Sequence, residues 1–144
     1  MAFQGTYDPK KVLVTFGPVL FSGFADGTFI NASRNNQGVN LAVGSTGDAA
    51  RAISNDKSGI VTLTLLQSSI VNGLMSGIER ADQENGDGVL PLFIKDLKGF
   101  DLVKAGTAWI QKLADYNRGR ELSDGNVVWV LETDDLDIFQ GGLL

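Results

Sequence analysis

An alternation of apolar and polar residues gives the clearest periodic signal in the chain. Val61, Leu63 and Leu65 fall on one side of this alternation. Thr62 and Thr64 fall on the other side. A period of two is that of a β-strand, so the segment predicts a strand with one face in a core and one face toward water. The hydroxyl groups of the second face suit a wall that is wet on one side.

Further short β-rich runs follow one another along the chain, separated by turn residues. We predict strands in Lys11–Phe16, Val19–Ala25, Thr28–Ala32, Val39–Val43, Val89–Lys95, Phe100–Leu113 and Val127–Leu131. Asp26-Gly27 predicts a two-residue hairpin turn between the second and third runs. Pro91 cannot donate a ladder hydrogen bond, which favours an edge position for its strand. Gly106 predicts a bulge within the longest run.

One segment has the period of a helix instead. Its apolar residues fall at positions i, i+3, i+4 and i+7, namely Val71, Leu74, Met75 and Ile78. This spacing predicts an α-helix over about 69–82. Ser68 or Ser69 is expected to cap its start, and Asn85–Gly88 is expected to end it.

Gly73 and Gly77 lie one turn apart on the predicted helix, and Ala81 continues the same stripe of small residues. Each glycine costs about 0.8–1 kcal/mol of helix propensity relative to alanine. Close approach of another backbone could offset this cost. The sequence leaves open whether that backbone belongs to the chain's own sheet or to a neighbouring subunit.

Two segments lack any clear period. The segment 44–58 predicts a long loop, and such loops are usually functional or disordered. The tail Leu136–Leu144 is expected to be mobile in isolation. Together the elements predict a single domain of residues 1–144 in the mainly β (α+β) class. The expected architecture is an antiparallel β-sandwich or barrel with one flanking α-helix.

The composition narrows the possible functions. The chain of 144 residues has no His and no Cys, and its formal net charge is −5. These two missing residue types supply most general bases near neutral pH and most transition-metal ligands. An acidic chain also gains little from counterion release on nucleic acid. The start has no apolar signal region, and no stretch is long and apolar enough to span a membrane, so we expect neither secretion nor a membrane anchor.

The remaining motifs do not predict a catalyst. The serine-nucleophile pattern Gly-x-Ser-x-Gly is missing from the sequence, and a Ser-His-Asp triad cannot form without His. The acidic run Asp134–Asp137 lacks the sharp glycine turn of a cation loop and reads as a solvated edge. We therefore expect no enzyme activity, no cofactor and no metal.

Several strings, taken in order, resemble bacteriophage tail tube proteins. The matching stretches are Tyr7–Val12, Gly23–Ile30, Ala50-Arg51, Ser54–Gly59, Val61–Leu65, Trp129, and Leu136 with Phe139–Gly142. None of them is a mechanistic motif, so the specificity comes from their order and spacing. The similarity runs nearly from end to end. Related tubes occur in contractile tails, tailocins and type VI secretion systems.

The resemblance implies hexameric rings whose sheets join across subunits into one barrel. The rings would stack into a hollow tube that conducts the duplex DNA genome from the virion to the host cell. The implied partners are other copies of the chain, the tape measure, tail terminator and baseplate proteins, and the tail sheath if the tail contracts. The sequence does not decide whether the tail contracts, although the resemblance favours contraction. The implied location is the tail of the virion, assembled in the host cytoplasm.

Particular residues are candidates for these contacts. Residues with both charge signs make segment 44–58 a candidate docking loop between subunits or rings, namely Asp48, Arg51, Asp56 and Lys57. Thr64 is a candidate for the shared sheet, and Gly73 and Gly77 are candidates for a helix contact. Asp101 and Glu132 are candidates for the lumen. Because like charges repel, an acidic or neutral lumen would let DNA slide.

A second hypothesis is a small β-rich hydrolase or carbohydrate-binding module. Its best feature is Trp109 or Trp129 as a platform on which a sugar could stack. Both residues lie inside alternating strand patterns, which favours a buried core position instead. The sequence therefore favours the structural subunit over this rival.

Overall fold

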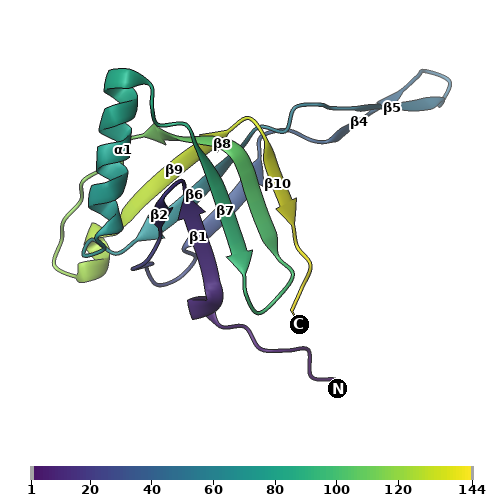
Figure 1. Cartoon of the computed structure of the whole chain (residues 1–144). Coiled ribbons are helices and arrows are strands. Elements are labelled where there is room, and N and C mark those ends of the chain that lie inside the picture. The colour runs from purple at the N-terminus through teal and green to yellow at the C-terminus, as the bar shows by residue number, and fades with distance from the viewer. Residues whose placement is uncertain (1, 144) are drawn as a thin grey trace.

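The computed structural model describes residues 2–143 as a mainly β protein with one α-helix, which confirms the predicted class (Figure 1). Its strands are β1 (Val12–Phe16), β2 (Val19–Leu20), β3 (Ile30–Arg34), β4 (Val39–Val43), β5 (Ala49–Ile53), β6 (Gly59–Leu65), β7 (Leu90–Asp96), β8 (Leu102–Lys112), β9 (Val127–Thr133) and β10 (Leu136–Phe139). The helix α1 spans Val71–Asn85. Short 3-10 helices span Pro9–Lys11 and Leu122–Gly125. The described helices include none that could cross a membrane.

A single antiparallel sheet folds over into two layers. Its strand order is β2-β1-β7-β8-β9-β6-β3, and β10 pairs with β8 beside this path. The long strand β8 belongs to both layers. Its first half pairs with β7 and β10, and its second half pairs with β9. Figure 1 shows β7, β10 and the first half of β8 in one layer, with β6 and β9 crossing behind them.

The core lies between the two layers and follows the predicted alternation. Val61, Leu63 and Leu65 on β6 are fully buried, and the residues between them are only half-buried. Trp129 on β9 is also buried. The helix closes one open side of the fold by burying Val71 and Met75 against this core. Leu74, which belongs to the same predicted apolar spacing, is half exposed.

The helix begins later and ends later than predicted. It starts at Val71, and neither Ser68 nor Ser69 occupies the capping position. Ser69 nevertheless accepts a hydrogen bond from the Val71 N–H at 3.3 Å, while its own hydroxyl donates to the Ser22 carbonyl at 2.7 Å. The predicted stop is confirmed in its mechanism. Gly86 ends the helix in the left-handed conformation with φ 72°, which glycine adopts without strain.

The edge position predicted from Pro91 is wrong. Strand β7 lies between β1 and β8. The missing donor is tolerated because it faces the end of β1: the Gly17 N–H donates to the Pro91 carbonyl at 2.8 Å, so the proline nitrogen points toward the turn that follows β1. The pairing of β7 with β8 skips from Ala105 to Ala108 across a bulge that contains Gly106. The bulge predicted at Gly106 is therefore confirmed, and it lies opposite the proline.

The hairpin predicted at Asp26-Gly27 is also wrong. The chain before this turn pairs with β6 through Phe24 and Leu65. The chain after it pairs with the same strand through Ile30 and Leu63. The turn therefore lets the chain bulge outward and continue along one edge of β6, instead of reversing its direction.

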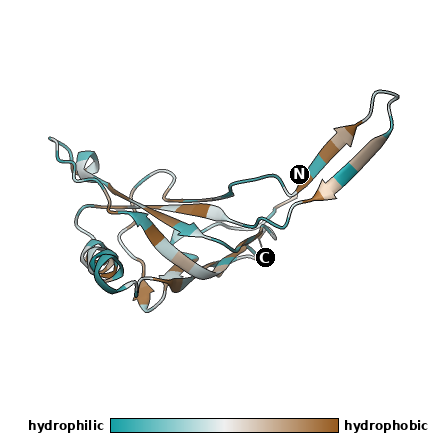
Figure 2. Cartoon of the chain, turned by 90° about the horizontal axis from the view of Figure 1, so that it is seen from above, coloured by the Kyte–Doolittle hydropathy of each residue, from teal (hydrophilic) through white to brown (hydrophobic). Residues whose placement is uncertain are grey.

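The segment 44–58 is not a long loop. Strands β4 and β5 form an antiparallel hairpin with a turn at residues 44–48. We call Val39–Ile53 the arm. It stands clear of the rest of the molecule (Figures 1 and 2). The alternation of a strand is not visible in the sequence of β5, because three of its five residues are alanines. Their small side chains distinguish neither an apolar nor a polar face.

The C-terminal tail is ordered by pairing, contrary to the predicted mobility. Strand β10 pairs with β8 through Leu136 and Ala105 at one end and Phe139 and Leu102 at the other. Leu136 is completely buried, so it anchors the tail in the core. Leu143 forms a further bridge with Gly99. Leu144 lies outside the described residues.

A Gly59→Ala variant is expected to lose stability. An added Cβ at this position would lie 2.7 Å from the Ser33 carbonyl oxygen and would also meet the Leu136 side chain. Because the backbone oxygen cannot move freely, we expect a loss of about 1–3 kcal/mol in the free energy of unfolding. Urea denaturation would measure this loss. Gly38→Ala, where an added Cβ meets nothing, is the matched control; equal stability of the two variants would contradict the packing described.

Candidate assembly surfaces

Four strands form a wall with a free edge at each side. Its order is the second half of β8, then β9, β6 and β3. Within the described residues, β3 pairs with β6 alone. The pairing of β7 with β8 ends at Ala108, so among residues 2–143 the segment Trp109–Lys112 has a strand partner only on its β9 side. Exposed strand edges readily pair with another chain.

The free edge of β3 offers unpaired backbone groups. The Thr64 N–H donates to the Phe29 carbonyl at 3.0 Å, and the Asn35 N–H donates to the Ser58 carbonyl at 3.0 Å. In an antiparallel ladder every second residue makes such bonds, so odd-numbered β3 residues bond to β6. The intervening residues, with Ala32 in the middle, direct their N–H and C=O groups toward the free side.

The outward face of the wall is largely uncharged. It is formed by Asn31, Ser33, Ile60, Thr62, Thr64, Trp109, Gln111, Val128, Val130 and Glu132. Glu132 is held by the Gln111 side chain, whose Nε2 donates to Oε2 at 2.9 Å. At the β8 edge, Lys112 forms an ion pair with Asp115 at 3.4 Å, and both side chains are well exposed.

The structure places the two lumen candidates on different surfaces. Glu132 lies on the outward face of the wall, opposite Trp109 in the ladder. Asp101 lies in the turn before β8, where it accepts a hydrogen bond from the Gly142 N–H at 3.2 Å. It borders a cleft of about 340 Å³ between β3 and β10. Thr64 lies on the outward face with Glu132, in a strand that already has a partner on each side.

The four charged docking candidates are spread along the arm and its root. Asp48 lies in the turn at the tip, where it accepts a hydrogen bond from the Thr46 hydroxyl at 3.1 Å. Arg51 lies in the middle of β5. Lys57 belongs to the body, since its carbonyl accepts the Leu136 N–H at 2.8 Å. They therefore do not form one cluster.

Asp56 fixes the root of the arm. Hydrogen bonds from the Ser58 side chain and backbone, together with one from the Asn36 side chain, lower the pKa of the Asp56 carboxyl below its ordinary value. A carboxyl whose pKa is lower in the folded state stabilises the fold above the unfolded pKa, and this contribution is lost as the pH falls through the folded value. The root of the arm is therefore held in place at neutral pH.

The arm carries an apolar face that its own chain does not cover. Val39, Leu41, Val43 and Ile53 are between 43% and 72% exposed. The ladder pairs Val39 with Ile53 and Leu41 with Arg51, which puts all of them on one face. The other face carries Asn40, Ala42, Ala50 and Ala52. Figure 2 shows apolar residues along both strands of the arm.

Sequence reasoning missed a second apolar surface, which we call the aromatic cleft. It is lined by Tyr7, Pro9, Lys10, Phe24, Ala25, Asp26, Gly27, Phe29 and Leu66, with a volume of about 780 Å³. The rings of Phe24 and Phe29 lie 4.8 Å apart between centroids. The clustering of aromatic residues around the Asp26-Gly27 turn is the signal for this surface in the sequence, and the predicted hairpin does not account for it.

The glycine stripe of α1 faces open space. An added Cβ at Gly73 or Gly77 would meet nothing within 4 Å. Packing against the chain's own sheet therefore does not explain these glycines. Ile70 and Leu74 are also exposed at this helix. A contact with a neighbouring subunit stays a prediction.

The structure gives no support to the sugar platform at Trp129. This residue is 1% exposed, and its Nε1 donates to the Asn72 Oδ1 at 3.0 Å. The core position predicted for Trp109 is wrong, because this residue is half-buried on the outward face of the wall, opposite Glu132. Within residues 2–143, no three acidic side chains lie together in a way that could hold a metal ion.

Comparison with known proteins finds similarity in fold and no match in sequence. No protein-family model and no curated protein matches the sequence. The structure is similar to a chain in the cryo-EM structure of the anti-feeding prophage cap (AFP tube terminating cap), with TM-score 0.63 and 14% identity over 98% of this chain and 95% of that chain. It is also similar to chains of an extracellular contractile injection system, PVC. In the sheath/tube terminator the TM-score is 0.61 with 10% identity, covering 96% of this chain and 100% of that chain. In the sheath-tube complex the TM-score is 0.57 with 12% identity, covering 94% and 92%.

Proposed function

We propose that this chain is a structural subunit of the tube of a phage tail or a related contractile assembly. Copies join into hexameric rings, and the rings stack into a hollow tube. The observation that carries the proposal is the four-stranded wall with a free edge at each side. The similarity in fold to tube and terminator assemblies extends over nearly the whole chain and supports it.

The geometry of the wall suits a closed ring. Adjacent strands of the wall are antiparallel, and their number is even. The two outermost strands, β8 and β3, therefore run in opposite directions. Joining β3 of one copy to β8 of the next continues the antiparallel order without a break. Such a contact uses two different surfaces, and repeating it by rotation generates a ring.

The proposed ring leaves an open channel. Six copies would contribute about 24 strands, and a spacing of about 4.8 Å gives a circumference of roughly 115 Å, which strand tilt widens further. The second layer and α1 lie on the core side of the wall. The space outside the ring is larger than the space inside it, so the second layer and α1 are placed outside. The outward face of the wall, with Glu132, then lines the lumen.

The proposed lumen would let duplex DNA pass without holding it. The face of the lumen carries mostly hydroxyl, amide and aliphatic groups. Glu132 is the carboxylate on this face, and Lys112 at its edge forms an ion pair with Asp115. Phosphate finds little to bind on such a surface, because affinity for the DNA backbone comes mainly from Lys and Arg. In this proposal Asp101 lies away from the channel.

A Glu132→Lys variant is expected to make assembled tubes retain DNA. The change replaces a negative charge with a positive one, which raises the net charge by two units per copy, and the ring repeats it around the channel. We expect duplex binding that weakens as salt rises from 50 to 200 mM. Filter binding at several salt concentrations measures this effect. Glu84→Lys, which makes the same change on exposed α1, is the control; equal DNA retention by both variants would place Glu132 outside the channel.

The proposed partners follow from this role. The main partner is the chain itself, and the ends of the tube would meet tape measure, terminator and baseplate proteins. The similar PVC structures are those of a contractile system, which supports a sheath around the tube. The proposed location is the tail of the particle, after assembly in the host cytoplasm.

A tube terminator is a second candidate function. It is favoured by two of the similar structures, which contain a tube terminating cap and a sheath/tube terminator. A terminator would form a single ring that does not stack on itself. Negative-stain microscopy of the purified chain separates the candidates: hollow rods support the tube subunit, isolated rings support the terminator, and dispersed monomers contradict both.

A further inference from the structure

The apolar face of the arm is not packed against any other part of the described chain. A two-stranded hairpin is at best marginally stable in water. Yet β4 and β5 hold a regular ladder of paired residues from Val39–Ile53 to Val43–Ala49. The exposed apolar face makes solvent an unfavourable environment. Because the opposite face is made of Asn40 and small alanines, only one face of the arm is suited to a hydrophobic contact.

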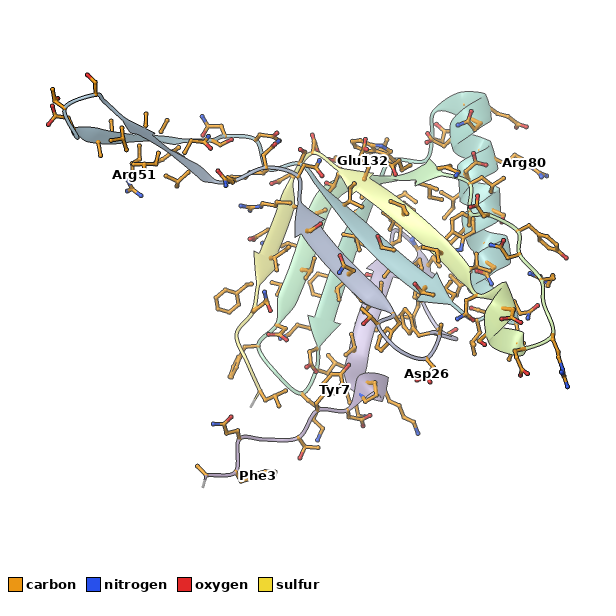
Figure 3. The ribbon with its side chains drawn as sticks, turned by 180° about the vertical axis from the view of Figure 1, so that it is seen from behind. Phe3, Tyr7, Asp26, Arg51, Arg80 and Glu132 are labelled. Carbon is orange, nitrogen blue, oxygen red and sulfur yellow. The ribbon has the colours of Figure 1, made fainter. Side chains whose placement is uncertain are left out.

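The arm and the aromatic cleft lie at opposite ends of the same pair of strands. The arm leaves the β3–β6 ladder at the end where Arg34 pairs with Gly59. The cleft lies at the other end, beside Leu65 and its bridge partner Phe24. Figure 3 shows the same relation, with Arg51 on the projecting arm and Asp26 and Tyr7 at the far end of the molecule.

We propose that the arm of one copy docks in the aromatic cleft of a second copy in the adjacent ring. This inference rests on the proposed function, because the copies must first be held in rings. In the ring, the wall strands run along the tube with a tilt. The arm therefore points toward the next ring, and the cleft of that ring faces back toward it.

The chemistry of the two surfaces is complementary. Leu41 and its neighbours on the arm present aliphatic groups, and the cleft presents the rings of Phe24 and Phe29. Arg51 shares the apolar face of the arm with Leu41. Asp26 is exposed at the rim of the cleft, where its carboxylate can pair with the guanidinium of Arg51. The guanidinium can also pack on the face of an aromatic ring of the cleft.

The placement of these surfaces also explains why the contact would build a tube. The arm and the cleft are different surfaces at opposite ends, so a docked pair leaves one arm and one cleft free. A contact of this kind adds copies without closing, whereas a two-fold contact would stop at a dimer. Repetition around each ring lets individually weak contacts add up.

The inference is tested first on the arm. Leu41→Asp places a charge on the apolar face, and Asn40→Asp places the same charge on the opposite face of the same strand. Electron microscopy of Leu41→Asp should show rings without rods, and Asn40→Asp should form rods like the unchanged chain. Rods of normal length from Leu41→Asp would overturn docking through this face.

The cleft is tested by cross-linking, for which the natural lack of cysteine is convenient. Protein carrying Leu41→Cys is mixed with protein carrying Asp26→Cys, assembled, and treated with a short bis-maleimide. We expect a cross-linked dimer in rods and none between Leu41→Cys and Lys104→Cys, which lies on the exposed face of β8. Rods without the Leu41–Asp26 cross-link would overturn the cleft as the acceptor. Failure of the unchanged chain to form rings would instead overturn the proposed function, and this inference with it.

Discussion

An Ala32→Pro variant is expected to fold normally and to form rings only at a much higher protein concentration than the unchanged chain. Ala32 lies in the middle of β3, and its N–H points toward the free edge instead of toward β6. Proline is tolerated at such an edge position, because no hydrogen bond within the chain is lost. In the proposed ring it removes a donor from the junction with β8 of the next copy, and its ring obstructs close approach. We expect the protein concentration needed for assembly to rise by more than tenfold.

Two controls make this result specific to the edge. Ala32→Val keeps the N–H and should assemble like the unchanged chain. Ser33→Pro removes a donor that bonds to β6 and should lower the melting temperature. Sedimentation of each variant over a range of concentrations, together with circular dichroism, separates assembly from folding. Normal rings from a folded Ala32→Pro protein would exclude β3 as the joining edge.

A Trp129→Ala variant is expected to lose more stability than any other single truncation in the core. Trp129 is the largest fully buried side chain, and it joins β9 to the helix through the Asn72 hydrogen bond. Large-to-small changes of this type lower the free energy of unfolding by about 3–5 kcal/mol. This is a large share of the about 5–15 kcal/mol typical of a domain. Chemical denaturation measures the change.

The matched variant separates packing from hydrogen bonding. Trp129→Phe keeps most of the buried ring but cannot donate to Asn72. We expect it to cost less than Trp129→Ala, because leaving a polar atom unpaired costs about 1–3 kcal/mol. A loss of under about 1 kcal/mol in Trp129→Ala would contradict the core position of this residue and would reopen the sugar-platform hypothesis.

The sequence predicted those elements whose side chains differ strongly between their two faces. The alternation at Val61–Leu65 and the spacing from Val71 to Ile78 give unambiguous periods, and both elements are present. The bulge at Gly106 was also predictable, because glycine weakens a regular ladder. Each of these signals is local, since it depends on residues that are neighbours in the sequence.

The failed predictions concern pairing between distant residues. Pro91 fits an edge position locally, because nothing near it in the sequence reveals that its nitrogen faces the turn at the end of β1. Asp26-Gly27 fits a hairpin turn locally, yet the chain on both sides pairs with β6, far along the sequence. The tail was expected to be mobile because the anchoring of Leu136 in the core depends on β8.

The candidate surfaces were only partly predictable. The docking role expected of segment 44–58 from its length and charges stays a prediction, and its hairpin structure and apolar face were missed. The four charges singled out there do not cluster. The structure instead shows Leu41 and Val43 as exposed apolar residues on one face of the arm. The aromatic cleft brings Tyr7 and Pro9 to the aromatic residues around the Asp26-Gly27 turn, and no local pattern reveals that these two segments share one surface.

Cryo-electron microscopy of the assembled protein tests the central claim most directly. We predict a hollow tube in which β3 of each copy lies antiparallel to the second half of β8 of the next copy. The outward face of the wall, with Glu132, should line the channel. A closed two-fold dimer, or rings joined through surfaces other than these two edges, would contradict the account.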